Sequence, residues 1–576
     1  MLIPRISATL IASVMALPVL ILNGGTPVAS ANAGIAVVLD PAQKIHPMLQ
    51  VELQTNPTSF VRVIVQKAKP DIKSNSLLSR IPTAQIIEEF SVVPAFVAAL
   101  PESAVSVLAM DKNVRYISPD GAVEVISGKA PKGAKPAAAP KAPKPAGHGR
   151  KQFDASKLVT TFPVDTGATS VWAGGGGKEQ LTGSGVSVAV IDSGVDAGHP
   201  DLSGNVVAVN VNRNSFNASD GYGHGTHVAG IINGHASDDR YLGIAPNATL
   251  ISVKVADDSG GAYVSDLLRG LDWVAAHQDD YKIRALNVSA SVSFPESYAT
   301  SPVDAAVERL WSDGVVVVTS AGNLGSDSDA VWYAPGNDPH VITVGCLDEN
   351  QTIAFSDDSL CPVSSRGVTE DGFAKPDLVA PGRKIASTLA SGVGGRSVGL
   401  AAEYPERVTS DGRHISMSGT SMSAPMVTGA VALLLDRHAS LTPSQIKQLL
   451  VDSARNYPGQ PDAAGALNIS AALADSDHPP ASSNQGSLPV GATAPVGGAT
   501  TIVWDGSRWT TTYWNGARWT GAYWDGARWT TTSWNGSRWT GAYWDGARWT
   551  GTYWDGARWT GTYWDGARWT SSSAFN

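Results

Sequence analysis

Short apolar runs rich in β-branched residues alternate with helical patterns along residues 152–474. One run, 188–191, ends in Asp192, and another, 315–318, consists of four valines. Continuous apolar character predicts strands that are buried on both faces. Amphipathic periodicity predicts helices at 264–277, 303–313, 421–438 and 443–452. This alternation predicts an α/β fold with a mostly parallel sheet and helices on both of its faces.

Three motifs in this region carry residue types suited to nucleophilic catalysis. Asp192 ends its strand, His224 lies in Gly-His-Gly-Thr-His-Val-Ala-Gly, and Ser421 lies in Ser-Gly-Thr-Ser-Met-Ser-Ala-Pro before an apolar helical pattern. A serine hydroxyl needs an adjacent base, which an imidazole supplies near neutral pH. A carboxylate can orient that imidazole and stabilise its charged form. The chain order Asp, His, Ser is one of the known orders of a catalytic triad.

Together these motifs closely resemble the subtilase family of subtilisin-like serine peptidases, from about residue 166 to about residue 474. The resemblance implies an endopeptidase that hydrolyses peptide bonds in proteins through Asp192, His224, Ser421 and an acyl-enzyme. It also assigns Asn323, in Ala-Gly-Asn after the valine run, as the amide donor to the oxyanion. His227 is expected to be structural, and its motif is not the His-Glu-x-x-His of a zinc site.

The resemblance assigns two segments to substrate binding and implies one local difference. After Ser289 the family usually has a large apolar residue and glycine, whereas this chain has Ala290 and Ser291. Because serine lacks the freedom of glycine at positive φ, we expect the specificity pocket to differ in shape. The expected substrate-binding residues are Ser289, Ala290, Ser291, Ser320, Ala321 and Gly322.

Composition and the N-terminus indicate an exported, multidomain protein. The chain has 576 residues, a net charge of −9 and 16% charged residues, so we expect several domains and no nucleic-acid partner. Residues 1–33 resemble a secretory signal peptide, with Arg5, an apolar stretch and Ala-Asn-Ala at the end. An N-terminal membrane anchor is the alternative, which Pro18 disfavours by interrupting the stretch. We expect a secreted, extracellular protein with no membrane span after signal removal.

Two further features concern stabilisation. Cys346 and Cys361 are predicted to form a disulfide because residues 348–350 and 356–359 between them have the composition of an exposed loop. Two buried thiols are the alternative.

No cofactor is expected. Asp201 matches a calcium ligand of some family members and could be joined by residues 237–239, although a solvated acidic loop is the other interpretation.

Residues 34–126 are similar to the inhibitor-type propeptides that precede subtilases. They combine a strand pattern at 60–65, a helix with proline at its start at 101–110, and a strand–turn–strand pattern at 114–125. The resemblance implies a self-processing precursor in which the propeptide is an intramolecular inhibitor. The alternative is an α+β domain that stays attached. Residues 127–151, rich in Ala, Pro and Lys, are predicted to be an extended linker before the peptidase domain at 152–474.

A second linker, 475–500, precedes an all-β repeat module at 501–570. A ten-residue unit recurs seven times from Trp504, and its Asp-Gly or Asn-Gly steps between aromatic residues predict hairpins with three-residue loops. Two interpretations of the tryptophans compete: a packed core, or exposed faces that stack on sugars of a cell wall or polysaccharide. The alternative function for the whole chain is therefore a surface or glycan-binding protein that uses its peptidase unit as a scaffold.

Overall fold

The computed structural model describes residues 41–55, 60–124, 153–174, 180–391, 399–459, 464–477 and 479, together with the strands between residues 508 and 570. The expected signal peptide, the 127–151 linker and nearly all of the 475–500 linker lie outside the described residues.

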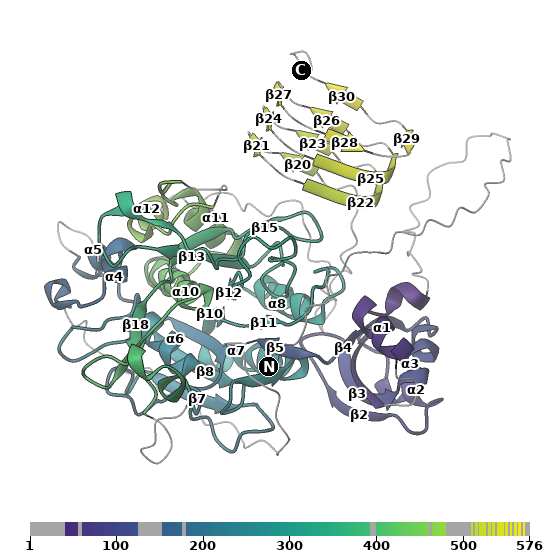
Figure 1. Ribbon diagram of the computed structural model, residues 1–576, viewed down its shortest axis with the longest axis horizontal. Coiled ribbons are helices and arrows are strands. Elements are labelled where there is room, and N and C mark those ends of the chain that lie inside the picture. The colour runs from purple at the N-terminus through teal and green to yellow at the C-terminus, as the bar shows by residue number, and fades with distance from the viewer. Residues whose placement is uncertain are drawn as a thin grey trace. The chain divides into compact units, whose positions relative to one another are not determined.

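An eight-stranded sheet runs through residues 153–477 in the order β14-β13-β12-β10-β6-β8-β7, with β17 paired to β13 (Figure 1). All of its pairings are parallel except β13 with β14. The predicted α/β class with a mostly parallel sheet is therefore confirmed. The strands are β6 (Ser187–Asp192), β7 (Val206–Asn210), β8 (Thr249–Lys254), β10 (Ile283–Val288), β12 (Val316–Ser320), β13 (Ile342–Asp348), β14 (Ser359–Leu360) and β17 (Leu378–Pro381).

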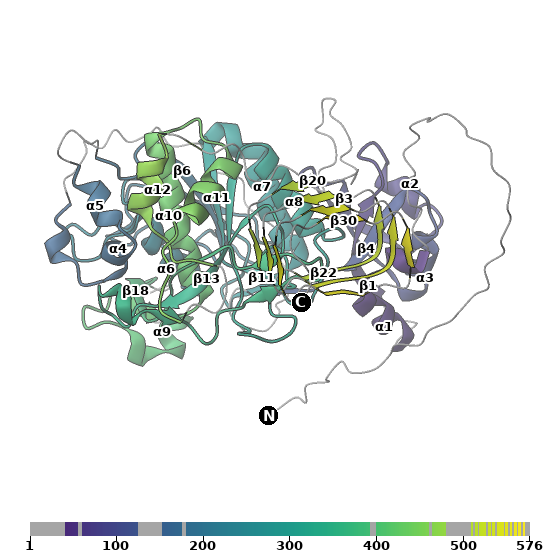
Figure 2. The same cartoon turned by 90° about the horizontal axis from the view of Figure 1, so that it is seen from above.

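Helices cover both faces of this sheet. α6 (His224–Asn233) and α10 (Thr420–Arg437) pack together on one face, and α7 (Val264–Tyr281) and α8 (Pro302–Ser312) pack together on the other (Figure 2). α10 is buried from Thr420 to Leu435, which makes it the central helix of the core. The other helices of this region are α4 (Phe162–Asp165), α5 (Ala168–Trp172), α9 (Leu400–Glu403), α11 (Pro443–Asp452) and α12 (Ile469–Asp475).

Local capping explains why two helices begin close to their predicted starts. The side chain of Ser301 accepts a hydrogen bond from the N–H of Asp304 ahead of Pro302. The side chains of Thr442 and Gln445 cap each other's backbone at the start of α11. Such caps satisfy N–H groups that a first turn leaves without partners. β18 (Ile385–Thr388) and β19 (His414–Met417) pair with each other, and α9 lies between them in the sequence.

Residues 41–124 begin with a small α+β unit. Its antiparallel sheet has the order β2-β3-β1-β4, and its core contains Val63, Phe96, Leu100 and Ile117. β5 (Ala122–Glu124) does not pair with β4 but lies between β9 (Gly261–Tyr263) and β11 (Ser291–Val292). The unit comprises β1 (Phe60–Lys67), β2 (Gln85–Glu89), β3 (Ala95–Pro101), β4 (Val114–Pro119), α1 (Pro47–Thr55), α2 (Ser74–Leu78) and α3 (Glu102–Ala109).

The repeat segment forms parallel strands, so the predicted hairpins are wrong. Trp509 lies opposite Trp529 and Arg518 opposite Arg538, in each case two repeat units further along the chain. The Asp-Gly step is a local signal that does not decide whether the next strand folds back or continues around a coil. In-register parallel stacking lets every identical unit repeat the same backbone pairing. The strands run from β20 (Arg508–Thr510) to β30 (Arg568–Thr570), the longest being β22 (Arg518–Asp525) and β25 (Arg538–Asp545). The loop residues 505–507 lie outside the described residues.

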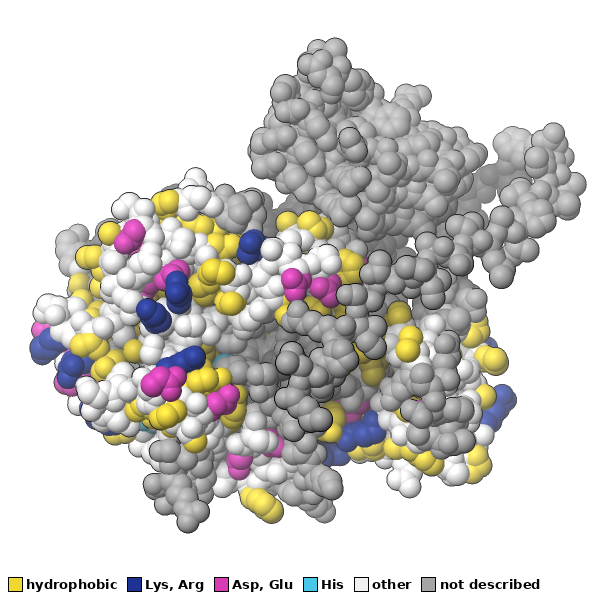
Figure 3. Space-filling model, viewed as in Figure 1, with side chains coloured by type: hydrophobic (Ala, Val, Ile, Leu, Met, Phe, Trp, Pro, Cys, Tyr) yellow, Lys and Arg dark blue, Asp and Glu magenta, His cyan; other side chains and the backbone are white. Residues whose placement is uncertain are grey.

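The described surface carries charges of both signs. On the face shown in Figure 3, Lys and Arg side chains are interspersed with Asp and Glu among apolar and uncharged polar groups. Among the helices of the described residues, none has the length and apolar character that crossing a bilayer requires.

Cys346 and Cys361 are joined by the expected disulfide, and the loop between them is exposed at most positions, as predicted, but it turns acidic side chains inward. Glu349 is 1% exposed, and Asp358 is also buried. The hydroxyl of Thr161 donates a hydrogen bond to Glu349 Oε1. Burial, together with the charges of Asp165 and Asp358, raises the pKa of Glu349 to about 8. A carboxyl group that ionises poorly inside the fold is tolerated where a polar partner is available.

We expect Glu349→Gln to stabilise the protein at alkaline pH. The folded-state pKa of Glu349 lies above its unfolded value, so its contribution to stability is complete below about pH 4.5 and is lost as pH rises towards about 8. Gln cannot ionise and can still accept from Thr161. In a Ser421→Ala background, the melting temperature should rise by at least about 3 °C at about pH 9 and change little at about pH 4. Asp357→Asn, at an exposed carboxylate of the same loop, is the control. Equal shifts at both pH values would contradict the assignment.

Candidate active site

Asp192 lies at the carboxyl end of a central strand. β6 pairs with β10 on one side and β8 on the other, and the side chain of Asp192 is fully buried. Its Oδ1 accepts a hydrogen bond of 2.7 Å from the N–H of Ser193. The edge formed by the carboxyl ends of parallel strands is where open α/β sheets place their sites.

His224 is the first residue of α6 and contacts Asp192 directly. Its Nδ1 lies 2.8 Å from Oδ1 and 2.9 Å from Oδ2 of that carboxylate. The close approach needs glycine at the next position, because a Cβ on Gly225 would lie 2.2 Å from the carbonyl oxygen of Gly194. The bond to the carboxylate fixes the tautomer with the proton on Nδ1, which leaves Nε2 as the basic atom. Among the described residues, Nε2 has no hydrogen-bond partner.

The electrostatic surroundings favour the charged imidazole. Burial lowers the pKa of His224, but the charge and hydrogen bond of Asp192 and the charge of Asp220 together raise it above its ordinary value. His227, one turn further along α6, is different. Its Nε2 donates to the carbonyl oxygens of Ile385 and Ile415, and burial, with the charge of His224, lowers its pKa to about 3. His227 is therefore a neutral residue that joins α6 to β18 and β19.

Ser421 is the second residue of α10 and lines a cavity. The cavity has a volume of about 360 Å³ and also contains Asn323 and all six residues expected to bind substrate. Sequence reasoning missed its remaining lining residues. Val292 and Ser293 simply continue the assigned segment, whereas Ala330 and Tyr333 reach the cavity only through the tertiary fold. The lining is Ser289, Ala290, Ser291, Val292, Ser293, Ser320, Ala321, Gly322, Asn323, Leu324, Ala330, Tyr333 and Ser421.

Hydrogen bonds hold the cavity wall against the start of α10. Ser289 Oγ donates to the carbonyl oxygen of Ser421 over 3.2 Å. Asn287 Nδ2 donates to Ser289 Oγ, and Asn287 Oδ1 accepts from the hydroxyl of Thr428 on α10. This chain of bonds ties the end of β10 to the helix that carries Ser421.

The amide of Asn323 is oriented by the same helix. Its Oδ1 accepts a hydrogen bond of 3.1 Å from the N–H of Thr420. An amide that is fixed through its oxygen presents its NH₂ group as the donor. The side chain of Asn323 is exposed at the cavity that Ser421 also lines.

The backbone at Ser291 does not need the positive φ that favours glycine. Ser291 is not among the residues with positive φ and adopts the extended conformation of β11. It needs no glycine-like freedom because it pairs antiparallel with Glu124 of β5. On its other side β5 pairs with β9, so Ala122–Glu124 fills the gap between two strands at the edge of the cavity.

Asp201, which matches a calcium ligand of some family members, contacts another side chain. Its Oδ2 lies 2.8 Å from Nε2 of His414, whose Nδ1 contacts Asp411. The ring of His414 stacks on Tyr241 with 3.5 Å between centroids. The described residues contain no cluster of three or more His, Cys, Asp or Glu side chains placed to hold a metal ion.

The fold and the site define a subtilisin-like α/β protein with a buried His–Asp pair and a serine-lined cavity. The sequence profile of the Subtilase family matches residues 183–470, and the chain belongs to this family of serine proteases.

Individual relatives support the same family assignment. Serine protease AprX of Bacillus subtilis (strain 168) is 37% identical over 302 residues, covering 50% of this chain and 66% of AprX. Subtilisin amylosacchariticus of Bacillus subtilis subsp. amylosacchariticus is 31% identical over 393 residues, covering 67% of this chain and 83% of that subtilisin. The crystal structure of fervidolysin from Fervidobacterium pennivorans, a keratinolytic enzyme related to subtilisin, has a TM-score of 0.54 at 25% identity, covering 75% of this chain and 62% of fervidolysin. The match thus spans just under two thirds of AprX and of fervidolysin.

Proposed function

We propose that this protein is a serine endopeptidase in which Ser421 is the nucleophile, His224 its base and Asp192 the carboxylate that orients the base. The observation that carries the proposal is the pairing of His224 Nδ1 with both oxygens of Asp192, because it leaves Nε2 basic and without a partner among the described residues. The family membership supports the same chemistry.

In this mechanism Ser421 Oγ attacks the carbonyl carbon of the scissile bond, and its proton passes to Nε2 of His224. Asp192 stabilises the imidazolium that forms. The oxyanion accepts hydrogen bonds from Asn323 Nδ2 and from N–H groups at the start of α10, where the helix dipole also favours negative charge. The imidazolium then protonates the leaving amine, and a water molecule hydrolyses the acyl-enzyme by the reverse sequence.

The test is hydrolysis of casein by the purified mature protein, with and without a fluorophosphonate directed at reactive serines. We expect turnover that the reagent abolishes, together with a covalent adduct on the peptide that contains Ser421. Turnover that resists the reagent, or an adduct on another serine, would contradict the proposal.

We also propose that residues 34–126 are an inhibitory propeptide and that the mature protein is secreted. Several contacts support docking of this segment on the catalytic region. Asp120 accepts from the N–H and hydroxyl of Ser265 at the start of α7. Glu88 pairs with Arg269, and Asp272 accepts from the N–H groups of Ser91 and Val92. An extended substrate would use the backbone edges of β9 and β11 that β5 occupies here. Export agrees with the disulfide, since such bonds persist in oxidising compartments.

We expect the wild-type precursor to cut itself after β5 and to lose the segment from residue 34 to a point between residues 126 and 151. The Ser421→Ala form should keep the segment from residue 34 onwards, because the cut needs the nucleophile. N-terminal sequencing of both forms from one host measures this, and Ser423→Ala should mature like the wild type. Finding the segment intact in a fully active wild type would refute self-processing. Cleavage of both forms at a lysine would indicate a foreign protease.

A further inference from the structure

A second buried carboxylate, Asp220, lies beside the His–Asp pair. Asp220 is 3% exposed and accepts four hydrogen bonds. Its Oδ1 accepts from Ser193 Oγ at 2.8 Å and from the N–H of Gly223 at 2.7 Å. Its Oδ2 accepts from the N–H and the hydroxyl of Thr226, both at 2.7 Å. Every donor thus belongs either to the residue after Asp192 or to the segment that holds His224.

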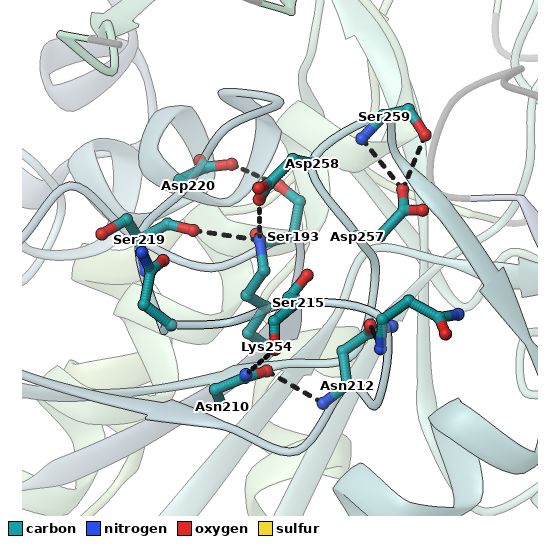
Figure 4. Close-up of polar contacts among 12 residues, drawn as sticks. Ser193, Asn210, Asn212, Ser215, Ser219, Asp220, Lys254, Asp257, Asp258 and Ser259 are labelled. Carbon is teal, nitrogen blue, oxygen red and sulfur yellow. Dashed lines mark hydrogen bonds and ion pairs between the residues drawn. The ribbon is translucent and has the colours of Figure 1, made fainter. Parts of the chain in front are cut away.

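Ser193 extends this connection to Asp192 and to the residue after His224. Its N–H donates to Asp192 Oδ1, and its Oγ accepts from the N–H of Gly225. Figure 4 shows Ser193 between Asp220 and Lys254, whose ammonium group donates to the carbonyl oxygens of Ser193 and Ser219 and to Asp258. The loops after Asp192 and before His224 are therefore fixed to one another through the side chains of Asp220 and Ser193.

We propose that Asp220 is a positioning residue for His224, because its carboxylate holds the first turn of α6 against the end of β6. This proposal deepens the proposed function and rests on it. Asp220 receives two N–H groups, those of Gly223 and Thr226, and one hydroxyl at the helix start, so it fixes where the helix begins and hence where its first side chain points. Small displacements of a catalytic group are costly to the rate.

The charge of Asp220 gives the same residue a second, electrostatic effect. The charged and titratable groups near His224 include Asp192 on β6, Lys254 on β8, His227 on α6, and Tyr222 and Asp220 in the loop before α6. His227 stays neutral near physiological pH, and the ammonium group of Lys254 is bonded to Asp258. Of the two nearby carboxylates, only Asp192 touches the imidazole. Asp220 adds negative charge that favours the imidazolium and raises the pKa of His224.

The decisive variant is Asp220→Asn, which keeps the size of the side chain and removes its charge. For casein hydrolysis we expect kcat to fall by about ten- to a hundredfold, with KM changed by less than about twofold. The midpoint of the acid limb of kcat/KM should move down by about one pH unit. In a Ser421→Ala background, ¹⁵N NMR of labelled histidine should show the same fall in the pKa of His224, identified as the signal lost in His224→Gln.

Two further variants keep the test decisive. Asp436→Asn removes a carboxylate that also accepts three backbone N–H groups, those of Thr182, Gly183 and Ser184, but lies outside the site. It should leave the acid limb and the pKa of His224 unchanged. Ser193→Ala should lower kcat at unchanged KM. This variant replaces Asp220→Asn as the test if Asp220→Asn does not fold. An unmoved acid limb and pKa in Asp220→Asn, or wild-type kcat in Ser193→Ala, would overturn the proposal. The NMR arm needs no turnover, so an inactive wild type would count against the proposed function alone.

Discussion

Replacement of Ser421 by alanine is expected to lower kcat/KM on casein by at least about 10⁴-fold, which corresponds to more than about 5 kcal/mol of transition-state stabilisation. The reason is that no other hydroxyl combines a place at the start of α10 with exposure to the cavity that also contains Asn323, among the residues that the structure describes. KM should change little, because removal of one hydroxyl leaves the cavity walls and the β9 and β11 edges intact.

Ser423 provides a matched control on the same helical turn. Its side chain is fully buried, and its hydroxyl lies close to the position that a Cβ on Gly382 would occupy. Ser423→Ala should therefore keep turnover within about threefold of the wild type, while any packing cost appears as a lower melting temperature. Near-wild-type turnover in Ser421→Ala would show that another group is the nucleophile. Equal losses in both variants would indicate a folding defect instead.

The second large effect is expected for Asn323→Ala. Loss of one oxyanion donor typically lowers kcat by about 10²- to 10³-fold, or about 3 kcal/mol. The amide is held by the N–H of Thr420 through its oxygen, so its NH₂ group is already oriented before substrate binds. Because negative charge on the substrate oxygen develops only in the transition state, the loss should fall on kcat and leave KM nearly unchanged.

Leu324→Ala is the control for this variant because Leu324 follows Asn323 and lines the same cavity. Its side chain can contact substrate in the ground state and the transition state alike, so any effect should appear mainly in KM. A fall in kcat of less than about threefold for Asn323→Ala would exclude its amide as an oxyanion donor. A change confined to KM would make Asn323 an ordinary substrate contact.

Much of the fold follows from local sequence. The valine run at 315–318 and the run before Asp192 are buried strands of one sheet, as their composition predicts. α11 begins and ends at the predicted residues because Thr442, Pro443 and Gln445 define its first turn. α7 runs to Tyr281 instead of ending at residue 277, because polar residues on its exposed side carry no stop signal.

Other outcomes depended on contacts between residues far apart in the chain. Glu349 lies in a segment with the composition of an exposed loop, yet its side chain is buried and accepts a hydrogen bond from Thr161. Asp201 matches a calcium ligand of some family members, yet it contacts His414 at the start of β19. The repeat units carry hairpin signals, yet they pair with units two copies away. In each case the local sequence pattern was compatible with two different environments, and contacts with distant residues decided between them.

The sequence by itself determined the α/β alternation, the identities of Asp192, His224, Ser421 and Asn323 as candidates, and the starts of the capped helices. The alternation and the helix starts depend on periodicity and capping, which act within a few residues, whereas the four site residues follow from motifs that resemble those of the subtilase family. Only the tertiary structure decided that β5 joins β9 and β11, that Asp220 and Ser193 connect the ends of β6 and α6, and that Ala330 and Tyr333 close the cavity. The physical reason is that hydrogen bonds and burial between distant segments depend on which surfaces the folded chain brings together.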